Sequence, residues 1–278
     1  MTRQLLVLGA TGAVGRGVVA AAAASRRPVL AVSADGAGLR ALRARHPDAD
    51  LTTIAAPLRS EADAAALAVR LRDRALCGVI ATIGTEAARG RLLDQPAEVL
   101  RRTLDEDLLP HLFAARHLFP LLPRHDRGTG YVLVGGPGGE YPWAGYGHRS
   151  IAAAALRMLA RVLHDEAGRA GLRVQLLTLD TPVRSDGNHA HACAEWPLAE
   201  AVGRRALALL ACAPARGAAP AVVPYASAPD LTSSEVEVAT FAAAHAEGAA
   251  DTAPELRDAR ALLDAIASTS PDSRTTPR

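Results

Sequence analysis

Short apolar runs alternate along the chain with longer segments in which apolar residues recur at helical spacing. The short runs predict strands at 5–8, 29–32, 51–55, 78–83, 131–134, 173–179 and 221–224. The longer segments predict helices at 14–24, 37–45, 60–72, 96–122, 146–170 and 198–211. We expect the helix over 96–122 to bend near Pro110, because proline removes a helical hydrogen bond. This alternation predicts an α/β, Rossmann-type doubly wound parallel sheet of about seven strands, with helices on both faces.

The pattern changes after Tyr225. Residues 233–246 and 254–266 predict two amphipathic helices, and the Ser/Thr/Pro-rich end from Ser268 is expected to be frayed. We therefore expect one α/β domain over 1–225, which includes a substrate loop, and a C-terminal helical extension over 226–278.

Composition and charge exclude several classes of protein. Hydrophobic residues make up 49% of the chain but aromatic residues only 3%, so we expect a core of Ala, Leu and Val. The net charge of +2, without a run of like charges, argues against a nucleic-acid partner. No apolar run is long enough for a membrane span, and the first strand begins too early to leave room for a signal peptide. Three cysteines with neither metal-site nor disulfide spacing favour a reducing cytoplasm and no metal.

All 31 basic residues are arginine, and the chain contains a single asparagine, Asn188. With the Ala-rich helices, this bias indicates a GC-rich, bacterial genome. Whatever its origin, the absence of lysine means that no step can use an ammonium side chain or a Schiff base.

A glycine-rich turn joins the first strand to the first helix. Its sequence, Gly9-Ala10-Thr11-Gly12-Ala13-Val14-Gly15-Arg16, has the spacing G-x-x-G-x-x-G. Glycine permits the sharp turn and a close approach of the backbone to a ligand, and the N–H groups at the helix N-terminus favour an anion. The turn predicts a dinucleotide-binding domain. A glycine-rich turn without a ligand is the alternative.

The end of the second strand normally reads the adenosine ribose of such a ligand. An acidic residue there favours NAD and an arginine favours NADP, but this chain has Ser33, with Asp35 two residues later. Arg16 in the glycine turn could meet a 2′-phosphate, so we favour NADP over NAD. Asp35 is alternatively an ordinary turn residue.

Residues 4–225 resemble the short-chain dehydrogenase/reductase family. The glycine turn is similar to that of extended and atypical members, and the rest of the chain follows the ordinary single-domain members. Ile83 and Gly84 stand in the family's loop after the fourth strand, although Pro57 replaces an aspartate that contacts adenine. The resemblance implies contacts with the cofactor from Gly9, Thr11, Gly12, Val14, Gly15, Arg16, Ser33, Ile83 and Gly84.

The same resemblance places Tyr146 at the position of the family's catalytic tyrosine. The other three catalytic positions differ: Asp107 aligns with the asparagine, the glycine-rich segment 135–139 replaces the serine, and Ser150 replaces the lysine. The family's lysine supplies positive charge near the tyrosine, whose phenol otherwise has a pKa of about 10. Without serine and lysine, standard carbonyl reduction should be slow.

A substitute proton relay is conceivable at this site. Arg149 follows Tyr146 by three residues, so the two can share a helix face, and its guanidinium could supply the positive charge. Asp107 could act as a base in place of the asparagine. We therefore name Tyr146, Arg149 and Asp107 as candidate catalytic residues. Alternatively, Tyr146 is a half-buried relic and Arg149 a solvated residue.

Two other groups of residues attract attention. Asp186, His189, His191 and Cys193 are of metal-ligand types, but their spacing lacks a partner pair, and they fall where the family has its substrate-covering loop. We expect them in a lid or a solvated loop, with 135–139, Trp143 and this loop forming the substrate pocket. His111 and His117 lie on the helix after Asp107 and are expected in the core or at an interface, since family members pair this helix and the one after Tyr146 across a homodimer.

Three functions stay open. The first, which we favour, is an enzyme: an oxidoreductase that uses NAD(P)(H) on a small-molecule carbonyl or alcohol with a non-standard relay. The second is an enzyme of the same fold that catalyses a dehydration, cyclisation or isomerisation. The third is a non-catalytic dinucleotide-binding protein, and a chain that binds no cofactor is also possible. This ranking of the three functions rests largely on analogy with other proteins of the same fold.

Overall fold

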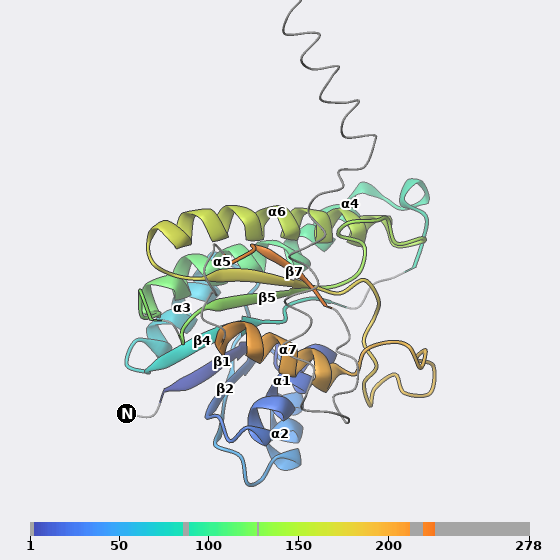
Figure 1. Cartoon of the computed structure of the whole chain (residues 1–278). Coiled ribbons are helices and arrows are strands. Elements are labelled where there is room, and N and C mark those ends of the chain that lie inside the picture. Colours follow the sequence, from blue (N-terminus) through green and yellow to red (C-terminus); the bar gives the residue numbers. More distant parts are fainter. Residues whose placement is uncertain (1–2, 86–88, 127, 212–218, 226–278) are drawn as a thin grey trace, which may run out of the picture. The chain divides into compact units, whose positions relative to one another are not determined.

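The central feature of the computed structural model is a parallel sheet; residues 3–85, 89–126, 128–211 and 219–225 are described (Figure 1). Its seven strands lie in the order β3-β2-β1-β4-β5-β6-β7. Their bounds are β1 Gln4–Leu8, β2 Val29–Ser33, β3 Leu51–Ala55, β4 Leu76–Ala81, β5 Tyr131–Gly135, β6 Val174–Thr178 and β7 Val222–Pro224. The central strands β1, β4 and β5 are buried on both faces, which is why they are almost wholly apolar.

Helices cover both faces of the sheet (Figure 1). One face carries α1 Ala13–Ala24, α2 Gly36–Arg45 and α7 Ala199–Ala211, and the other carries α3 Glu61–Leu71, α4 Ala97–Asp107, α5 Leu109–Leu118 and α6 Gly147–Arg169. Two 3₁₀ turns, η1 Leu92–Asp94 and η2 Phe119–Leu121, flank α4 and α5. The predicted α/β, doubly wound fold is therefore confirmed.

The glycines Gly17 of α1 and Gly203 of α7 allow these two helices to cross at close range. A Cβ at Gly17 would lie 2.1 Å from the carbonyl oxygen of Ala199, and a Cβ at Gly203 would lie 2.4 Å from that of Gly17. The contact fixes the start of α7, and with it the end of the loop that follows β6, against the flank of α1.

The structure corrects some predicted bounds. Strand β4 begins at Leu76 and ends at Ala81, because Leu76 already pairs beside Gln4, so Ile83 lies in the loop that follows the strand. The helix over 96–122 is interrupted at Leu108, near Pro110 as expected, and Pro110 stands in the first turn of α5, where its missing N–H costs nothing. The predicted helices at 233–246 and 254–266, the frayed end and the extension over 226–278 lie outside the described residues.

Strand order reverses between β1 and β4, since the chain returns from the edge strand β3 to the centre of the sheet. In doubly wound sheets, ligands bind at the carboxyl ends of the strands at such a switch point. Among the described residues, no helix has the length and apolarity that a membrane span requires.

Candidate functional site

The glycine turn between β1 and α1 has the tight geometry that its sequence predicts. Gly9 has a φ of +71°, and a Cβ there would lie 2.4 Å from the carbonyl oxygen of Thr82. A Cβ at Gly15 would lie 2.2 Å from the carbonyl oxygen of Gly9. Gly12 is the N-cap of α1 and carries no capping side chain, so the first N–H groups of the helix stay open to an anion.

A cavity of about 330 Å³ lies along this turn and the carboxyl ends of the neighbouring strands. Its walls come from the glycine turn, the ends of β2 and β3, the loop after β4, and α4 with the start of α5. The lining residues are Gly9, Thr11, Gly12, Val32, Ser33, Ala34, Ala56, Leu58, Arg59, Thr82, Ile83, Gly84, Thr85, Asp105, Glu106 and Pro110. We call it the dinucleotide cavity, after the ligand that the sequence of the glycine turn predicts.

Three of the residues predicted to contact the cofactor lie outside the lining of this cavity. Val14 packs against the core, and Gly15 is needed for backbone packing within the turn. The guanidinium of Arg16 donates to the carbonyl oxygen of Thr11 and lines a different cavity. The six others, Gly9, Thr11, Gly12, Ser33, Ile83 and Gly84, line the dinucleotide cavity.

The end of β2 is organised by short polar contacts. The hydroxyls of Ser33 and Thr11 lie 2.7 Å apart, which ties the strand end to the glycine turn. Asp35 caps α2, because its Oδ1 accepts the N–H of Gly38 at 2.9 Å, so Asp35 is the turn residue that was the alternative to a ribose contact. The arginine that lines this cavity is Arg59, after β3, and sequence reasoning missed it.

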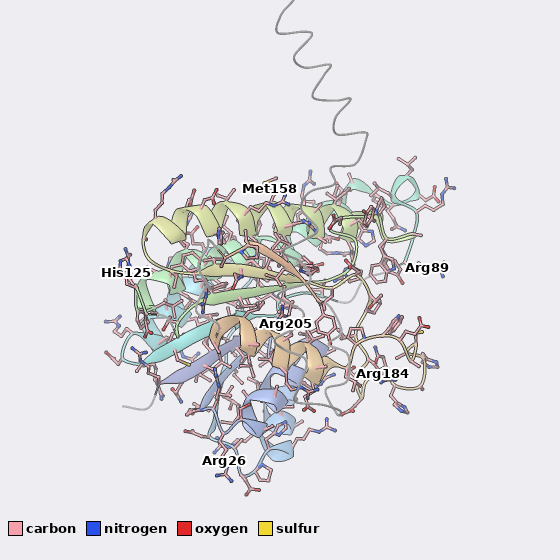
Figure 2. The ribbon with its side chains drawn as sticks, viewed as in Figure 1. Arg26, Arg89, His125, Met158, Arg184 and Arg205 are labelled. Carbon is pink, nitrogen blue, oxygen red and sulfur yellow. The ribbon has the colours of Figure 1, made fainter. Side chains whose placement is uncertain are left out.

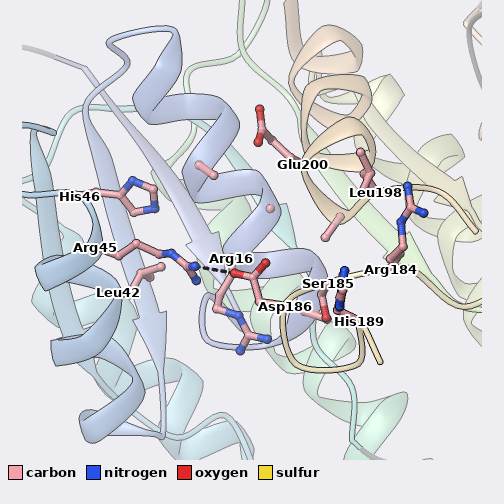
Figure 3. Close-up of a pocket in the computed structure, with 14 residues that line it drawn as sticks. Arg16, Leu42, Arg45, His46, Arg184, Ser185, Asp186, His189, Leu198 and Glu200 are labelled. Atoms are coloured by element: carbon pink, nitrogen blue, oxygen red, sulfur yellow. Dashed lines mark ion pairs between the residues drawn. The ribbon is translucent and has the colours of Figure 1, made fainter. Parts of the chain in front are cut away.

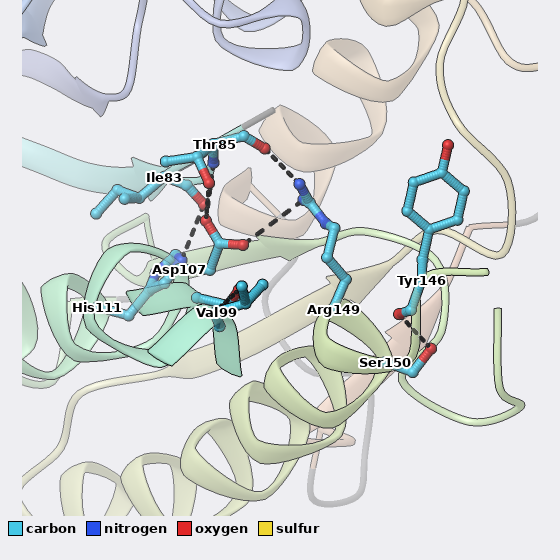
Figure 4. A network of polar contacts seen from close by, with 9 residues as sticks. Ile83, Thr85, Val99, Asp107, His111, Tyr146, Arg149 and Ser150 are labelled. Atoms are coloured by element: carbon cyan, nitrogen blue, oxygen red, sulfur yellow. Dashed lines mark hydrogen bonds and ion pairs between the residues drawn. The ribbon is translucent and has the colours of Figure 1, made fainter. Parts of the chain in front are cut away.

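A second polar centre lies where α4 breaks, beside the loop after β4 (Figure 4). The side chain of Asp107 is 9% exposed, and its Oδ1 accepts the N–H and the hydroxyl of Thr85 at 2.8 and 2.9 Å. The guanidinium of Arg149 lies 3.9 Å from Asp107 Oδ2 and donates to the carbonyl oxygen of Thr85. The predicted pair Asp107 and Arg149 is thus brought together, with Thr85 as the residue that joins them.

A small cavity of about 40 Å³ adjoins this polar centre. It is lined by Ile83, Gly84, Asp107, Val134, Gly135, Gly136, Pro137, Arg149, Ala152, Ala153 and Leu156. Ile83 and Gly84 line this cavity and the dinucleotide cavity alike, so the two are neighbours. No hydroxyl from β5 faces it, as the glycines at 135 and 136 predict.

Tyr146 stands apart from the pair of Asp107 and Arg149. It precedes α6 as the N-cap residue, and its ring stacks on Trp143 with centroids 4.1 Å apart. Ser150 supports this turn, since its hydroxyl accepts the N–H of Trp143 at 2.9 Å and donates to the carbonyl oxygen of Tyr146 at 3.2 Å. Among the described residues, no hydrogen bond joins the Tyr146 hydroxyl to Asp107 or Arg149, and Figure 4 draws none between them.

His111 belongs to the core, which is one of the two places expected for it. Its side chain is fully buried, and Nε2 lies 3.2 Å from the carbonyl oxygen of Ile83. Burial lowers its pKa from 6.5 to about 4, because a cation is poorly solvated there. Asp107 and His111 therefore hold the loop after β4 from the two sides of the helix break. His117 is half-buried beside Glu61.

The loop after β6 does not wall the small cavity, contrary to the expected substrate lid. Ser185, Asp186 and His189 instead line a third cavity, on the flank of α1. His191 and Cys193 are exposed or half-exposed loop residues, and no group of three metal-ligand side chains occurs in the part of the chain that the structure describes. The expectation of a solvated loop fits these two residues better than a lid does.

Comparison with known proteins identifies the fold. No family model and no curated protein sequence matches the chain. Many solved structures do, among them an oxidoreductase of the short-chain dehydrogenase/reductase family from Burkholderia thailandensis, with 23% identity and a TM-score of 0.66 over 76% of this chain and 86% of that one. A glucose/ribitol dehydrogenase of this family from Brucella melitensis has 18% identity and a TM-score of 0.67 over 80% and 93%. A bulky-bulky ketone specific alcohol dehydrogenase from Comamonas testosteroni has 17% identity and a TM-score of 0.61 over 99% and 98%.

Proposed function

The fold is that of the short-chain dehydrogenases/reductases, and we propose that this chain is an oxidoreductase of that family that acts on a small-molecule carbonyl or alcohol with NADP(H) or NAD(H). The observation that carries the proposal is the pair of adjoining cavities. One follows the glycine turn, the other holds Asp107 and Arg149, and Ile83 and Gly84 line both. A dinucleotide held in the first would direct its reactive end toward the second.

The residues present suit such a cofactor, which when bound supplies the hydride. The N–H groups at the start of α1 would bind the pyrophosphate, and Gly9 and Gly12 let it approach the backbone. Tyr146 does not line the small cavity, so it would donate the proton to a substrate carbonyl that extends beyond this cavity toward the start of α6. Arg149 would supply positive charge near the phenol, and Asp107, with Thr85, would hold the guanidinium in place.

We propose NADP(H) in preference to NAD(H), now on account of Arg59 instead of Arg16. The acidic residues that line the dinucleotide cavity, Asp105 and Glu106, come from α4, whereas Ser33 at the end of β2 and Arg59 after β3 line it without a carboxylate at that strand end. A hydroxyl and a guanidinium suit a 2′-phosphate, and a carboxylate would repel it. Parallel titrations with NADPH and NADH, followed by thermal shift, test this preference.

The substitution Gly12→Asp tests the dinucleotide cavity. The φ of −67° and ψ of 166° at Gly12 suit an aspartate N-cap, which offsets the tight contact of 3.3 Å between the new Cβ and the carbonyl oxygen of Gly9, while the carboxylate repels the pyrophosphate. We expect cofactor affinity to fall by roughly a hundredfold, or about 3 kcal/mol. Gly168→Asp, at an open position near the end of α6, is the control that should bind normally. Equal binding by Gly12→Asp and Gly168→Asp would refute the assigned cavity.

The substitution Tyr146→Phe tests the proton donor. Phenylalanine keeps the stacking on Trp143, so the fold should be unaffected, and loss of a general acid should lower turnover by roughly a hundredfold. Tyr141→Phe, at a tyrosine that is 79% exposed, is the matched control. Turnover unchanged by Tyr146→Phe would show that this tyrosine is a relic.

A second function, non-redox chemistry on the same fold, is favoured by one observation. Asp107 and Arg149 line the small cavity, which holds only about 40 Å³. There an aspartate could move a proton while an arginine holds an oxyanion, as a dehydration or isomerisation requires. Conversion of substrate by the wild-type protein without consumption of bound NADPH would favour this function. NADPH binding without any conversion of substrate would favour the non-catalytic function.

We also propose a homo-oligomer formed through helix faces, in a reducing cytoplasm. Ile151, Met158 and Val162 form an exposed apolar stripe along α6, and Cys77 and Cys193 are free thiols in the described part of the chain. Sedimentation of the wild type beside Met158→Glu measures the assembly. A wild-type monomer at micromolar concentration would refute it.

A further inference from the structure

A third cavity, of about 400 Å³, lies on the flank of α1, where Ala13 and Arg16 at the end of the glycine turn form part of its wall (Figure 3). It is enclosed by α1, the end of α2, the loop after β6 and the start of α7. The lining residues are Ala13, Arg16, Gly17, Ala20, Leu42, Arg45, His46, Arg184, Ser185, Asp186, His189, Leu198, Ala199 and Glu200. None of them lines the dinucleotide cavity or the small cavity, so this flank cavity is a separate site.

Arginines dominate the charged groups of the flank cavity. Its two carboxylates are already engaged: Asp186 pairs with Arg45 at 2.5 Å, as Figure 3 shows, and Glu200 pairs with Arg204 at 2.7 Å. Two guanidiniums are then left without a carboxylate. Those groups belong to Arg16 and Arg184.

Both of these arginines retain free donors. Arg16 donates to the carbonyl oxygen of Thr11, which uses one of its five N–H groups. The half-buried side chain of Arg184 has no hydrogen-bond or ion-pair partner among the described residues. A guanidinium partly removed from water and unpaired is unfavourable, so a bound anion would stabilise this arrangement.

The fold holds the loop part of this cavity in place. Arg184 is fixed on both sides, because its N–H donates to Pro197 and its carbonyl oxygen accepts from Ala199 at the start of α7. The side chain of Asn188 closes the turn, accepting the N–H of Ser185 at 2.8 Å and donating to the carbonyl oxygen of Val183 at 2.8 Å. A cavity whose walls are fixed in this way needs little ordering to bind a ligand.

We propose that the flank cavity binds a small phosphate monoester. Guanidinium forks match the oxygens of a phosphate, and two unneutralised guanidiniums suit its double charge. Much of the remaining wall is small and apolar, from Ala13, Ala20, Leu42 and Leu198, and its other polar groups are those of His46, Ser185 and His189, so the body of the ligand is uncharged and partly apolar. Asp186 competes with the ligand for Arg45, so removal of its carboxylate should strengthen ligand binding.

Calorimetry with phenyl phosphate, with phenol as the uncharged counterpart, measures this site directly. We expect phenyl phosphate to bind and phenol not to bind. Arg184→Gln should lower the affinity for phenyl phosphate roughly tenfold, which corresponds to the loss of one charged hydrogen bond. Arg205→Gln, at an exposed arginine of α7 outside the cavity (Figure 2), is the control and should bind like the wild type. Equal losses in the Arg184 and Arg205 variants, or tighter binding of benzoate than of phenyl phosphate, would overturn the proposal.

The substitution Asp186→Asn should change the affinity for phenyl phosphate in the opposite direction to Arg184→Gln. Removal of its carboxylate frees Arg45, so phenyl phosphate should bind several-fold more tightly, whereas a loop that merely needed this ion pair would bind it less well. Saturating NADPH should leave the affinity for phenyl phosphate unchanged, because the two cavities share no residue. Displacement by NADPH would assign the phosphate to the dinucleotide cavity and overturn this proposal, and failure of NADPH to bind would leave it unaffected.

Discussion

The dinucleotide cavity and the small cavity meet at Ile83 and Gly84, but they are built in different ways. One wall of the first is the backbone of the glycine turn, where Gly9 and Gly12 allow close approach and Gly15 lets the turn pack on itself. The second is formed by side chains from distant segments, since Asp107 ends α4 and Arg149 lies on α6. A backbone-built site depends on a few glycines at fixed spacing, whereas a side-chain-built site can change its chemistry while the backbone stays the same.

The largest expected effect breaks the backbone-built site. Gly15→Val places a Cβ 2.2 Å from the carbonyl oxygen of Gly9 and 2.8 Å from the Cα of Ala10, and neither backbone atom can move without opening the turn. We expect a loss of about 4 kcal/mol or more in the free energy of unfolding, with no measurable cofactor binding. Chemical denaturation and a cofactor titration measure both.

The control for this prediction lies in the small cavity. A Cβ at Gly136 would have no atom within 4 Å, so Gly136→Val should change stability by less than about 1 kcal/mol. If Gly15→Val were as mild as Gly136→Val, the difference between the two sites would not hold.

The next prediction tests whether the missing lysine is the only difference that keeps the second site from the family's standard chemistry. Ser150 is buried, with its hydroxyl between Trp143 and Tyr146, and a Cβ at Gly138 would lie 2.7 Å from this hydroxyl. Ser150→Lys would force a long cation into this space, so we expect a loss of about 3 kcal/mol in stability and no gain in turnover. Ser150→Ala separates the lost hydrogen bonds from the added bulk, and a stable, more active Ser150→Lys enzyme would show that the site is unchanged apart from that residue.

A smaller effect concerns the carboxylate that holds the second site together. Asp107→Ala leaves the N–H of Thr85 without its acceptor and Arg149 without its carboxylate, so the free energy of unfolding should fall by about 2 to 3 kcal/mol. Asp107→Asn keeps an acceptor for the N–H of Thr85, so its loss in the free energy of unfolding should be roughly half as large. Thermal or urea unfolding measures both, with Asp73→Ala, an exposed aspartate, as control. A loss no greater than that of Asp73→Ala would mean that the contacts of Asp107 are not stabilising.

The fold and the first site could be predicted from the sequence for the same reason. Strand and helix periodicity, and the spacing of Gly9, Gly12 and Gly15, are local properties of the chain. The bound of β4 was missed by two residues, because pairing with Gln4 includes Leu76. The role of Arg59 was missed because it depends on how the segment after β3 lies against β2.

The second site could be predicted only in part. The alignment of Asp107 and the position of Arg149 after Tyr146 identified two of its residues, but no local pattern marks Thr85, 22 residues from its partner Asp107. The loop after β6 was expected at the substrate pocket, and the glycine contact between α1 and α7 places it on the flank of α1 instead. Such long-range packing has no local signature in the sequence.

The prediction with the smallest effect at neutral pH concerns His111, which contacts the loop that lines both cavities. His111 has a folded pKa of about 4 and an unfolded pKa of about 6.5, so between these values the unfolded chain binds more protons than the folded one. The stability contributed by keeping His111 neutral is complete above about pH 6.5 and is lost as the pH falls toward 4. Between pH 7 and pH 5 the free energy of unfolding should fall by about 2 kcal/mol through this residue.

His111→Gln should remove most of this pH dependence while costing little at pH 7, since an amide can still donate to the carbonyl oxygen of Ile83. His191→Gln, at an exposed histidine, is the control and should keep the wild-type slope. Urea unfolding from pH 7 to pH 5 measures the slopes. Because the Ile83 loop lines both cavities, any loss of cofactor binding in this variant should be accompanied by slower turnover. A loss confined to one of them would mean that the loop does not couple the two sites.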